Sequence, residues 1–286
     1  MRRILLTGGA GYIGSHTAVA LSNMGYEIVL LDNLSNSGID AIRKLQQIVG
    51  RATPFVKGDM CATKLVADTL DAYAVDAVVH FAGLKAVGES VEKPVDYYAN
   101  NVQGTISLLQ AMKSVQVKTL VFSISATVYD EPRYLPLDED HPTSATNPYD
   151  RSKLHIEEML KDVAASDPAW RMACLRYFNP LGAHESGLIG ENPNVVPNNL
   201  MPYIAQVAAG RRAELSVLEM PQSFEKISGR QVPYKVVGRR VGDIAACYAE
   251  PSQAREKLGW RATRTLDDMC ASTWRFQQSE LVGLSS

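Results

Sequence analysis

The feature that most constrains the fold is a glycine-rich loop near the N-terminus, Thr7-Gly8-Gly9-Ala10-Gly11-Tyr12-Ile13-Gly14. A short apolar run precedes the loop, and a helical pattern over Tyr12–Asn23 follows it. In such a strand–loop–helix unit, glycines permit a tight turn and let the backbone approach a pyrophosphate. The N-terminus of the helix offers unpaired N–H groups and the positive end of its dipole. The loop therefore predicts a dinucleotide-binding domain of the Rossmann type.

An acidic residue, Asp32, ends the next apolar run, Glu27–Asp32. A carboxylate at this point is placed to accept a hydrogen bond from a ribose 2′-hydroxyl. It would repel a 2′-phosphate, and the next residue is Asn33 rather than an arginine. The pattern favours NAD over NADP as the cofactor, and it favours this role over a plain strand-end turn for Asp32.

Short apolar, β-branched runs alternate with helical patterns as far as Phe178. Such alternation indicates a parallel sheet with helices on both faces. After Phe178, prolines punctuate shorter helices. We therefore expect an α/β fold: a doubly wound NAD-binding Rossmann domain over residues 1–178 and a smaller α/β substrate domain over 179–286. The expected strands are Ile4–Thr7, Glu27–Asp32, Pro54–Lys57, Ala77–Phe81, Thr119–Ser125 and Met172–Phe178, and the expected helices are Tyr12–Asn23, Leu65–Tyr73, Tyr98–Lys113 and Tyr149–Ala164.

The composition excludes several classes of protein. A net charge of -2 leaves no basic field for nucleic acid. No apolar run approaches transmembrane length, and no signal-peptide pattern follows Met1. The four cysteines, Cys61, Cys174, Cys247 and Cys270, have no metal-binding spacing. We expect a soluble cytoplasmic protein with no metal, no nucleic-acid partner and no membrane partner.

A tyrosine and a lysine four residues apart, Tyr149 and Lys153, follow the turn signal Asn147-Pro148. This spacing places both side chains on one helix face. A nearby ammonium and a positive nicotinamide favour phenolate, so we expect the pKa of Tyr149 to be lowered. Such a tyrosine can remove an alcohol proton while hydride leaves the same carbon. Ser125, at a strand end, is placed to bind the same oxygen; the alternative role is a strand-end cap.

Together these residues resemble the extended short-chain dehydrogenase/reductases and, within them, the UDP-glucose 4-epimerase family. The similarity covers nearly the whole chain, and its most specific stretches are HFAGLKAVGES, RYFNPLGAHESGLIGE and PNNLMPYIAQVA. It implies interconversion of UDP-glucose and UDP-galactose through a 4-keto sugar, with hydride returned to the opposite face. Ser125, Tyr149 and Lys153 match the catalytic residues. The resemblance also implies a homodimer that pairs through the two helices over Tyr98–Lys113 and Tyr149–Ala164.

The resemblance further implies which positions bind each ligand. Lys85 would lie near the pyrophosphate and Asp59 beside the adenine. Cys247, a small residue, implies UDP-N-acetylhexosamines as further substrates. Asn199 and Arg240 have a helix cap and a surface charge as alternative roles. Besides the glycine loop and the catalytic residues, the NAD positions are Asp32, Asn33, Leu34, Ser35, Asn36, Ser37, Asp59, Met60, Phe81, Ala82, Gly83, Leu84, Lys85, Asn100 and Phe178. Besides Ser125 and Tyr149, the UDP-sugar positions are Asn179, Asn199, Leu200, Arg240, Asp243 and Cys247.

The chain departs from the family pattern at one large site. A long family segment is missing between Leu215 and Ser216. Its loss implies a missing diphosphate contact, an exposed sheet edge and a new connection. Pro221, where the family continues a helix, predicts a helix over Pro221–Ser228 that Gly229 ends.

Two aspartates stand where the family has glycine. Asp130 would be strained if the backbone there has a positive φ. Asp150, beside the catalytic tyrosine, is expected to raise the pKa of Tyr149.

Two alternatives to an epimerase remain open. A sugar-nucleotide dehydratase would carry an Asp-Glu pair after the strand-end serine, where this chain has Ala126-Thr127. The missing segment leaves a catalytically inactive NAD-binding protein as the other alternative.

Overall fold

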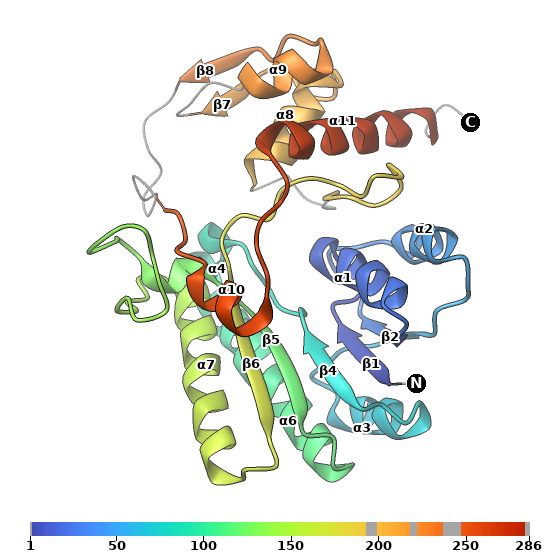
Figure 1. The fold of residues 1–286 in the computed structure, drawn as a ribbon, viewed down its shortest axis with the longest axis vertical. Coiled ribbons are helices and arrows are strands. Elements are labelled where there is room, and N and C mark those ends of the chain that lie inside the picture. Colours follow the sequence, from blue (N-terminus) through green and yellow to red (C-terminus); the bar gives the residue numbers. More distant parts are fainter. Residues whose placement is uncertain (1, 193–198, 218–221, 237–246, 284–286) are drawn as a thin grey trace. The chain divides into compact units, whose positions relative to one another are not determined.

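The computed structural model describes residues 2–192, 199–217, 222–236 and 247–283 (Figure 1). The chain divides into two compact units, Met1–Phe178 with Ala246–Glu250, and Asn179–Ala245 with Pro251–Ser286. Backbone hydrogen bonds of Leu137 connect the segment that ends at Glu250 to the rest of the first unit. The Leu137 N–H donates to the Tyr248 carbonyl at 2.9 Å, and the Leu137 carbonyl accepts from the Glu250 N–H at 2.7 Å. Which ligand each unit binds stays a prediction.

The first unit contains one parallel sheet, so the expected doubly wound fold is confirmed. Its strand order, β3-β2-β1-β4-β5-β6, reverses direction between β1 and β4. Such a reversal opens the crevice in which α/β proteins bind ligands, at the carboxyl ends of the strands. The strands are β1 (Arg3–Thr7), β2 (Glu27–Asp32), β3 (Phe55–Lys57), β4 (Ala77–His80), β5 (Thr119–Ser125) and β6 (Arg171–Tyr177), each within one residue of its expected bounds.

Helices connect these strands. The expected helix at Tyr98 is present but starts as a π-helix, and α2 was not among the expected helices. The elements are α1 (Tyr12–Asn23), α2 (Ile39–Val49), α3 (Thr63–Ala72), α4 (Val87–Glu92), α5 (Pro94–Tyr97), the π-helix η1 (Tyr98–Gln103), α6 (Gly104–Ser114), the 3-10 helix η2 (Ala126–Tyr129) and α7 (Pro148–Ser166).

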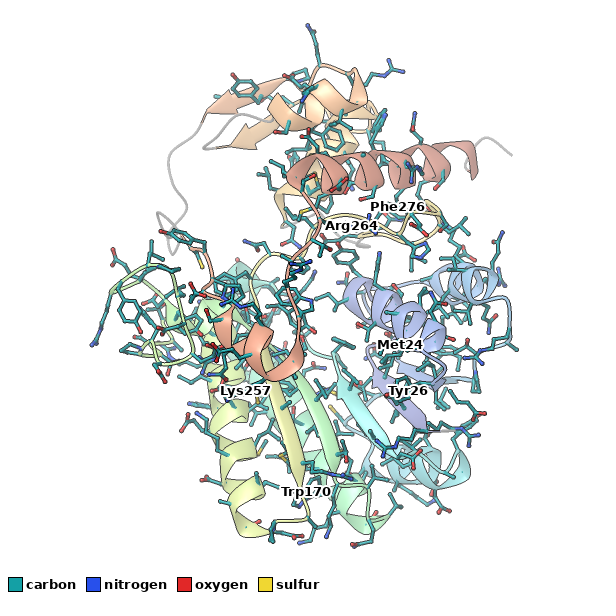
Figure 2. All side chains as sticks on the ribbon, in the orientation of Figure 1. Met24, Tyr26, Trp170, Lys257, Arg264 and Phe276 are labelled. Atoms are coloured by element: carbon teal, nitrogen blue, oxygen red, sulfur yellow. The ribbon has the colours of Figure 1, made fainter. Side chains whose placement is uncertain are left out.

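The main core lies under α3, α6 and α7. Leu70, Met112 and Leu160 from these helices pack against Leu5 and Phe122 of the sheet. Trp170, just before β6, belongs to the same core (Figure 2). Helices α1 and α2 pack against each other and contribute none of these residues.

Burial differs along the sheet. Every residue of β1 and β2 after the first is buried, because helices cover both faces. In β5 only alternate residues are buried, and every residue of β6 keeps some exposure. Within the described ranges no strand pairs with the outer side of β6. The predicted exposed sheet edge is therefore present.

The second unit contains α8 (Leu200–Ala208), β7 (Leu215–Val217), α9 (Gln222–Ser228), β8 (Tyr234–Val236), α10 (Ser252–Leu258) and α11 (Leu266–Gly283). Helices α8, α9 and α11 share a small core that includes Ile204, Phe224 and Cys270. Phe276 on α11 packs directly on Gly190, where an added Cβ would lie 2.5 Å from its ring (Figure 2).

Two predictions fall in this unit. The helix expected to begin at Pro221 is present as α9; Pro221 itself lies outside the described residues. Gly229 ends α9 as predicted: its φ is +64° and its N–H donates to the Glu225 carbonyl at 3.0 Å. The Leu215–Ser216 junction lies inside β7, which pairs in parallel with β8. The predicted new connection is thus a continuous strand.

No helix in the described part of the chain is long and apolar enough to cross a membrane.

Candidate active site

The glycine loop between β1 and α1 is packed against backbone. Gly8 has φ +67°, and a Cβ there would lie 2.7 Å from the Ala82 nitrogen. A Cβ on Gly14 would lie 2.3 Å from the Gly8 carbonyl oxygen. Gly11 is the N-cap of α1, and no described side chain caps this helix. A helix N-terminus of this kind, at the end of a glycine loop, is a site that suits an anionic ligand such as a pyrophosphate.

The Asp32 carboxylate, at the end of β2, connects the two loops beside this crevice. It is 8% exposed and accepts hydrogen bonds from the Ala10 N–H at 3.0 Å and the Leu34 N–H at 2.8 Å. The Ser37 hydroxyl donates to it at 3.2 Å. A carboxylate has about four acceptor sites, so capacity for a ribose hydroxyl remains. Asp32 therefore fills its turn role and is still able to bind a ribose.

Asp59, after β3, lies close to Asn33, whose side-chain amide donates to it at 3.1 Å. The Cys61 N–H also donates to Asp59 at 2.8 Å. Burial raises the pKa of Asp59, but these hydrogen bonds outweigh burial and leave the pKa lowered. Met60 is buried beneath Gly104, where a Cβ would lie 2.6 Å from its Cε. The predicted positions after β2 and β3 therefore lie together.

A histidine that the sequence interpretation missed lies at the strand reversal. His80 Nδ1 is 2.6 Å from the Thr7 hydroxyl, and Nε2 is 3.1 Å from the Thr105 hydroxyl. Thr105 donates its proton to the Asn101 carbonyl at 2.7 Å, so it accepts from Nε2–H, and Nδ1 accepts from Thr7. Burial, with a smaller contribution from the charge of Lys153, lowers the pKa of His80 to about 3. His80 is a neutral link between β1, β4 and α6.

Asn101, in the π-helix, was also missed, since the sequence interpretation chose its neighbour Asn100. Its side chain accepts from the Leu84 N–H at 2.8 Å and donates to the Leu84 carbonyl at 3.0 Å. It also donates to Ser152 at 3.0 Å, and Ser152 donates to the Tyr149 carbonyl at 2.7 Å. Asn101 thus joins the predicted cofactor loop after β4 to α7. The Asn-Asn doublet alone gave no means of choosing, although π-helices often mark functional sites.

Ser125 and Tyr149 meet at the carboxyl end of β5. Ser125 is the N-cap of η2, and its Oγ accepts from the Thr127 N–H at 3.3 Å and the Thr127 hydroxyl at 3.0 Å. The same serine lies near Tyr149. The cap role considered for Ser125 is therefore present, and its contact with a substrate oxygen stays a prediction. Tyr149 is buried near the start of α7, where Asn147 caps the helix and Pro148 is the first residue.

Lys153 lies one turn after Tyr149. Its Nζ donates to the Ser123 carbonyl at 3.1 Å and lies 4.8 Å from the centroid of the Phe122 ring. Burial lowers the pKa of Lys153 to about 8.

The expected lowering of the Tyr149 pKa is not found in the protein alone. Burial raises it to about 12, the nearby Ser125 hydroxyl lowers it, and the charge of Asp150 raises it further. Burial dominates because the tyrosine is only 8% exposed. The predicted effect of Asp150 is present. The predicted strain at Asp130 is also present, since its φ is +54° and its ψ is -140°.

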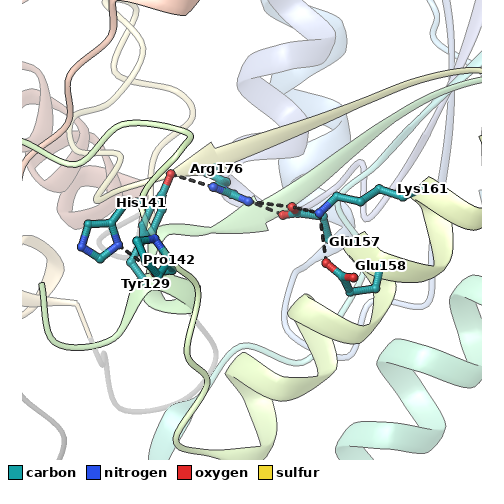
Figure 3. Close-up of polar contacts among 7 residues, drawn as sticks. All are labelled: Tyr129, His141, Pro142, Glu157, Glu158, Lys161 and Arg176. Carbon is teal, nitrogen blue, oxygen red and sulfur yellow. Dashed lines mark hydrogen bonds and ion pairs between the residues drawn. The ribbon is translucent and has the colours of Figure 1, made fainter. Parts of the chain in front are cut away.

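A buried ion pair is connected to η2 through the Tyr129 hydroxyl (Figure 3). Arg176 on β6 pairs with Glu157 on α7 at 2.6 Å and donates to the Tyr129 hydroxyl at 2.8 Å. Lys161 also pairs with Glu157, at 3.2 Å. This cluster connects the edge strand, the catalytic helix and the short helix that follows Ser125.

The predicted substrate positions are distributed over both units. Phe178 packs near Ala126 and Tyr129, and exposed Cys247 also belongs to the first unit. Asn179 and Leu200 are exposed residues of the second unit. Asn199 is at the N-cap position of α8, but its side chain donates to Glu191 at 2.6 Å rather than capping the helix. Arg240 and Asp243 lie outside the described residues.

The sheet reversal, the glycine loop and the Ser125–Tyr149–Lys153 arrangement define an NAD-dependent short-chain dehydrogenase-type enzyme. The chain belongs to the NAD dependent epimerase/dehydratase family, which matches residues 4–227. NAD is therefore the cofactor, and the closely packed loop, the uncapped α1 terminus and Asp32 fit it.

Curated relatives resemble the chain over its whole length. The UDP-glucose 4-epimerase of Bacillus subtilis is 46% identical over 335 residues, covering 99% of each chain. The UDP-glucose 4-epimerase of Homo sapiens is 46% identical over 343 residues, again covering 99% of each. These alignments are longer than the 286 residues of this chain, so the relatives contain residues that it lacks.

Solved structures of UDP-glucose 4-epimerases also resemble this chain over nearly its whole length. The UDP-glucose 4-epimerase of Stenotrophomonas maltophila, with NAD and formylated UDP-arabinopyranose, has a TM-score of 0.95 and 39% identity, covering 99% of this chain and 100% of its own. That of Bifidobacterium longum, in complex with NAD+ and UDP, has a TM-score of 0.94 and 40% identity, covering 98% and 99%.

Proposed function

We propose that the chain interconverts UDP-glucose and UDP-galactose by transient oxidation at C4 of the hexose. The observation that carries this proposal is the buried pair Tyr149 and Lys153, one turn apart on α7, beside Ser125 at the end of β5. This group lies at the carboxyl end of β5, in the unit that contains the glycine loop. The substrate assignment is supported by the names of the relatives.

The bound dinucleotide supplies a hydride acceptor and donor. Tyr149, as phenolate, takes the proton of the C4 hydroxyl and later returns it, so the sugar passes through a 4-keto form. Ser125 hydrogen-bonds to the same substrate oxygen. Lys153, held by the Ser123 carbonyl, contributes a positive charge beneath the site. The dinucleotide, when bound, would return the hydride to the opposite face of the sugar, which would invert C4.

The sugar nucleotide is assigned to Asn179, Asn199, Leu200, Arg240, Asp243 and Cys247. The small side chain at Cys247 extends the proposal to UDP-N-acetylhexosamines. We also propose a cytoplasmic homodimer that pairs through α7 and the helix formed by η1 and α6. Tyr98 of η1 and His155 of α7 stack with their ring centroids 6.1 Å apart, which joins these elements into one surface.

A second candidate is an NAD-binding protein with little or no catalysis. The residues that the relatives have and this chain lacks favour it.

One experiment separates the two candidates. The purified chain is incubated with UDP-galactose, UDP-glucose is measured, and Tyr149→Phe is the control. Turnover that Tyr149→Phe abolishes supports the epimerase. No turnover, with NAD still co-purifying, contradicts it and supports the binding protein.

A further inference from the structure

The loop over residues 179–192 contains no helix or strand, and it bears on two predicted sugar-nucleotide positions. Asn179 is its first residue. Near its other end, the Glu191 carboxylate accepts a hydrogen bond from the side-chain amide of Asn199 at 2.6 Å. A hydrogen bond to a carboxylate is one of the stronger kinds, so it fixes how the Asn199 side chain lies. The position of the loop therefore decides where both asparagines lie.

Helix α11 hydrogen-bonds to the backbone of this loop through two serines that lie on one face of the helix, about two turns apart. The Ser272 hydroxyl accepts from the Ala183 N–H at 3.1 Å. The Ser279 hydroxyl donates to the Gly187 carbonyl at 2.5 Å. A partly buried backbone group that loses its partner costs free energy unless the loop opens to water. The two serines therefore supply partners that a neighbouring strand or helical turn would otherwise provide.

The same face of α11 makes two further contacts with the loop. The Arg275 guanidinium donates to the Glu185 carbonyl at 2.7 Å. The Phe276 ring, labelled in Figure 2, packs on Gly190 so closely that an added Cβ would lie 2.5 Å from the ring. The loop is thus in contact with α11 at intervals over residues 183–190.

Helix α11 is itself held from another side. Cys270 belongs to the small core that also contains Ile204 of α8 and Phe224 of α9. The Trp274 ring packs edge-on against Phe224, with the ring centroids 5.9 Å apart. These apolar contacts involve none of the residues that bind the loop. Helix α11 is therefore a base to which the loop is attached, and its own packing does not depend on the two serines.

We propose that Ser272 and Ser279 are positioning residues for the sugar nucleotide. They hold the 179–192 loop on α11, and this loop places Asn179 and Asn199. Since the ligand is taken from the proposed function, the assignment rests on that function. The predicted NAD positions lie in the first unit, whereas the loop and α11 both belong to the second. A loosened loop should therefore weaken binding of the sugar nucleotide and leave NAD binding intact.

A purely structural role makes a different prediction. If the two serines only stabilise the second unit, their removal lowers its stability but leaves the nucleotide affinity of the folded protein unchanged. Positioning predicts that the loop opens more often and that the affinity falls at temperatures where the variant is fully folded. The test therefore measures the loop and the ligand separately.

The first measurement is amide hydrogen exchange, which needs no ligand. Within the loop, the His184 N–H donates to the Ile189 carbonyl at 3.0 Å, so its exchange reports opening of the loop. In the double variant Ser272→Ala with Ser279→Ala, this amide should exchange about tenfold faster, because two hydrogen bonds that hold the loop are lost. Gln278→Ala, at an exposed position of the same helix, is the matched control and should leave the exchange unchanged.

The second measurement is calorimetric titration of the NAD-loaded protein with UDP. The double variant should bind UDP about tenfold more weakly, with its NAD content unchanged. Ser279→Thr retains a hydroxyl and should bind UDP more tightly than Ser279→Ala. In the epimerase assay, the double variant should raise KM and keep kcat, because Tyr149 and Lys153 belong to the other unit.

Unchanged exchange in the double variant would overturn the proposal, because the loop would then be held without α11. So would an unchanged UDP affinity with faster exchange, because the loop would then not position the nucleotide. If the double variant folds poorly, Arg275→Gln decides: it removes an exposed donor to the Glu185 carbonyl and should show both effects to a smaller degree. An unchanged protein that binds no UDP contradicts the proposed function, whereas the exchange experiment still decides whether α11 holds the loop.

Discussion

The two ends of the sheet are stabilised in different ways. Strands β1 and β2 are buried on both faces, and the glycine loop packs on their backbone. Strand β5 carries Ser125, and α7 beside it carries the other two predicted catalytic residues, but β5 is buried on one face only and β6 is a partly exposed edge. Apolar burial is the main contribution at the first end. At the second end, the Arg176–Glu157 ion pair and the Tyr129 hydroxyl hold the edge strand to its neighbours.

This difference separates cofactor binding from catalysis. The end predicted to bind the dinucleotide has a closely packed backbone, whereas the end proposed to move protons depends on polar contacts. We therefore expect substitutions at the two ends of the sheet to impair different properties of the protein.

The largest effect is expected at the ion pair. Glu157→Gln leaves the Arg176 guanidinium partly buried without its carboxylate, which should reduce the free energy of unfolding by about 3 kcal/mol. Urea unfolding followed by circular dichroism measures this. Glu158→Gln, which removes an exposed partner of Lys161, is the control and should cost under about 0.5 kcal/mol. Equal losses in both variants would show that the polar cluster does not hold the edge strand.

The next effect concerns the other end of the sheet. Gly14→Ala would place a Cβ 2.3 Å from the Gly8 carbonyl oxygen, and backbone has little freedom to yield. We expect a loss of about 2 kcal/mol and failure to co-purify with NAD. Gly88→Ala, which meets nothing within 4 Å, should retain NAD and stability. The measurements are NAD content and thermal unfolding; normal NAD content in Gly14→Ala would contradict the close packing.

His80 should make the stability depend on pH. Its folded pKa of about 3 lies below the ordinary value of 6.5, so the unfolded chain binds the extra proton first. Stability from this group is complete above about pH 6.5 and falls by about 1.4 kcal/mol per pH unit as the pH drops toward 3. When the free energy of unfolding is measured at several pH values, its slope against pH should be shallower in His80→Gln than in the unchanged protein. Exposed His155→Gln should keep the original slope, and identical slopes in all three proteins would refute the assignment.

The smallest effect is a gain. Asp130 adopts φ +54° and ψ -140°, a region that only glycine occupies without strain. Asp130→Gly should therefore increase the free energy of unfolding by about 1 kcal/mol. Asp130→Ala removes the charge but keeps the strain, so it should not gain. Urea midpoints compare them, and a gain in Asp130→Ala would attribute the effect to charge instead.

Much of the fold was predictable because its signals are local. The six strands are apolar runs, and the glycine loop and Asp32 mark the crevice directly. Helix α2 was missed; its buried face is limited to Ile42 and Leu45. The end of α9 at Gly229 and the strain at Asp130 were predicted because each depends on the φ angle of one residue.

The supporting residues of the site were not predictable in the same way. Thr127, His80 and Asn101 have ordinary side chains whose roles arise from partners up to 73 residues away. The predicted lowering of the Tyr149 pKa was wrong for the protein alone because burial, which depends on the whole fold, raises this pKa and the charge of Asp150 raises it too. Local patterns therefore predict which residues react, whereas three-dimensional packing determines their acidity.

The hydrogen-bonded series from Thr7 through His80, Thr105, Asn101 and Ser152 to the Tyr149 backbone has a consequence for protein engineering. Four of its links join different elements, so the start of the glycine loop at Thr7 and the helix α7 share one structural support. A library that randomises only residues in reach of the ligands would leave this support untouched. A library at Thr105 or Asn101 would alter cofactor affinity and turnover together, and would do so from positions that neither ligand need contact.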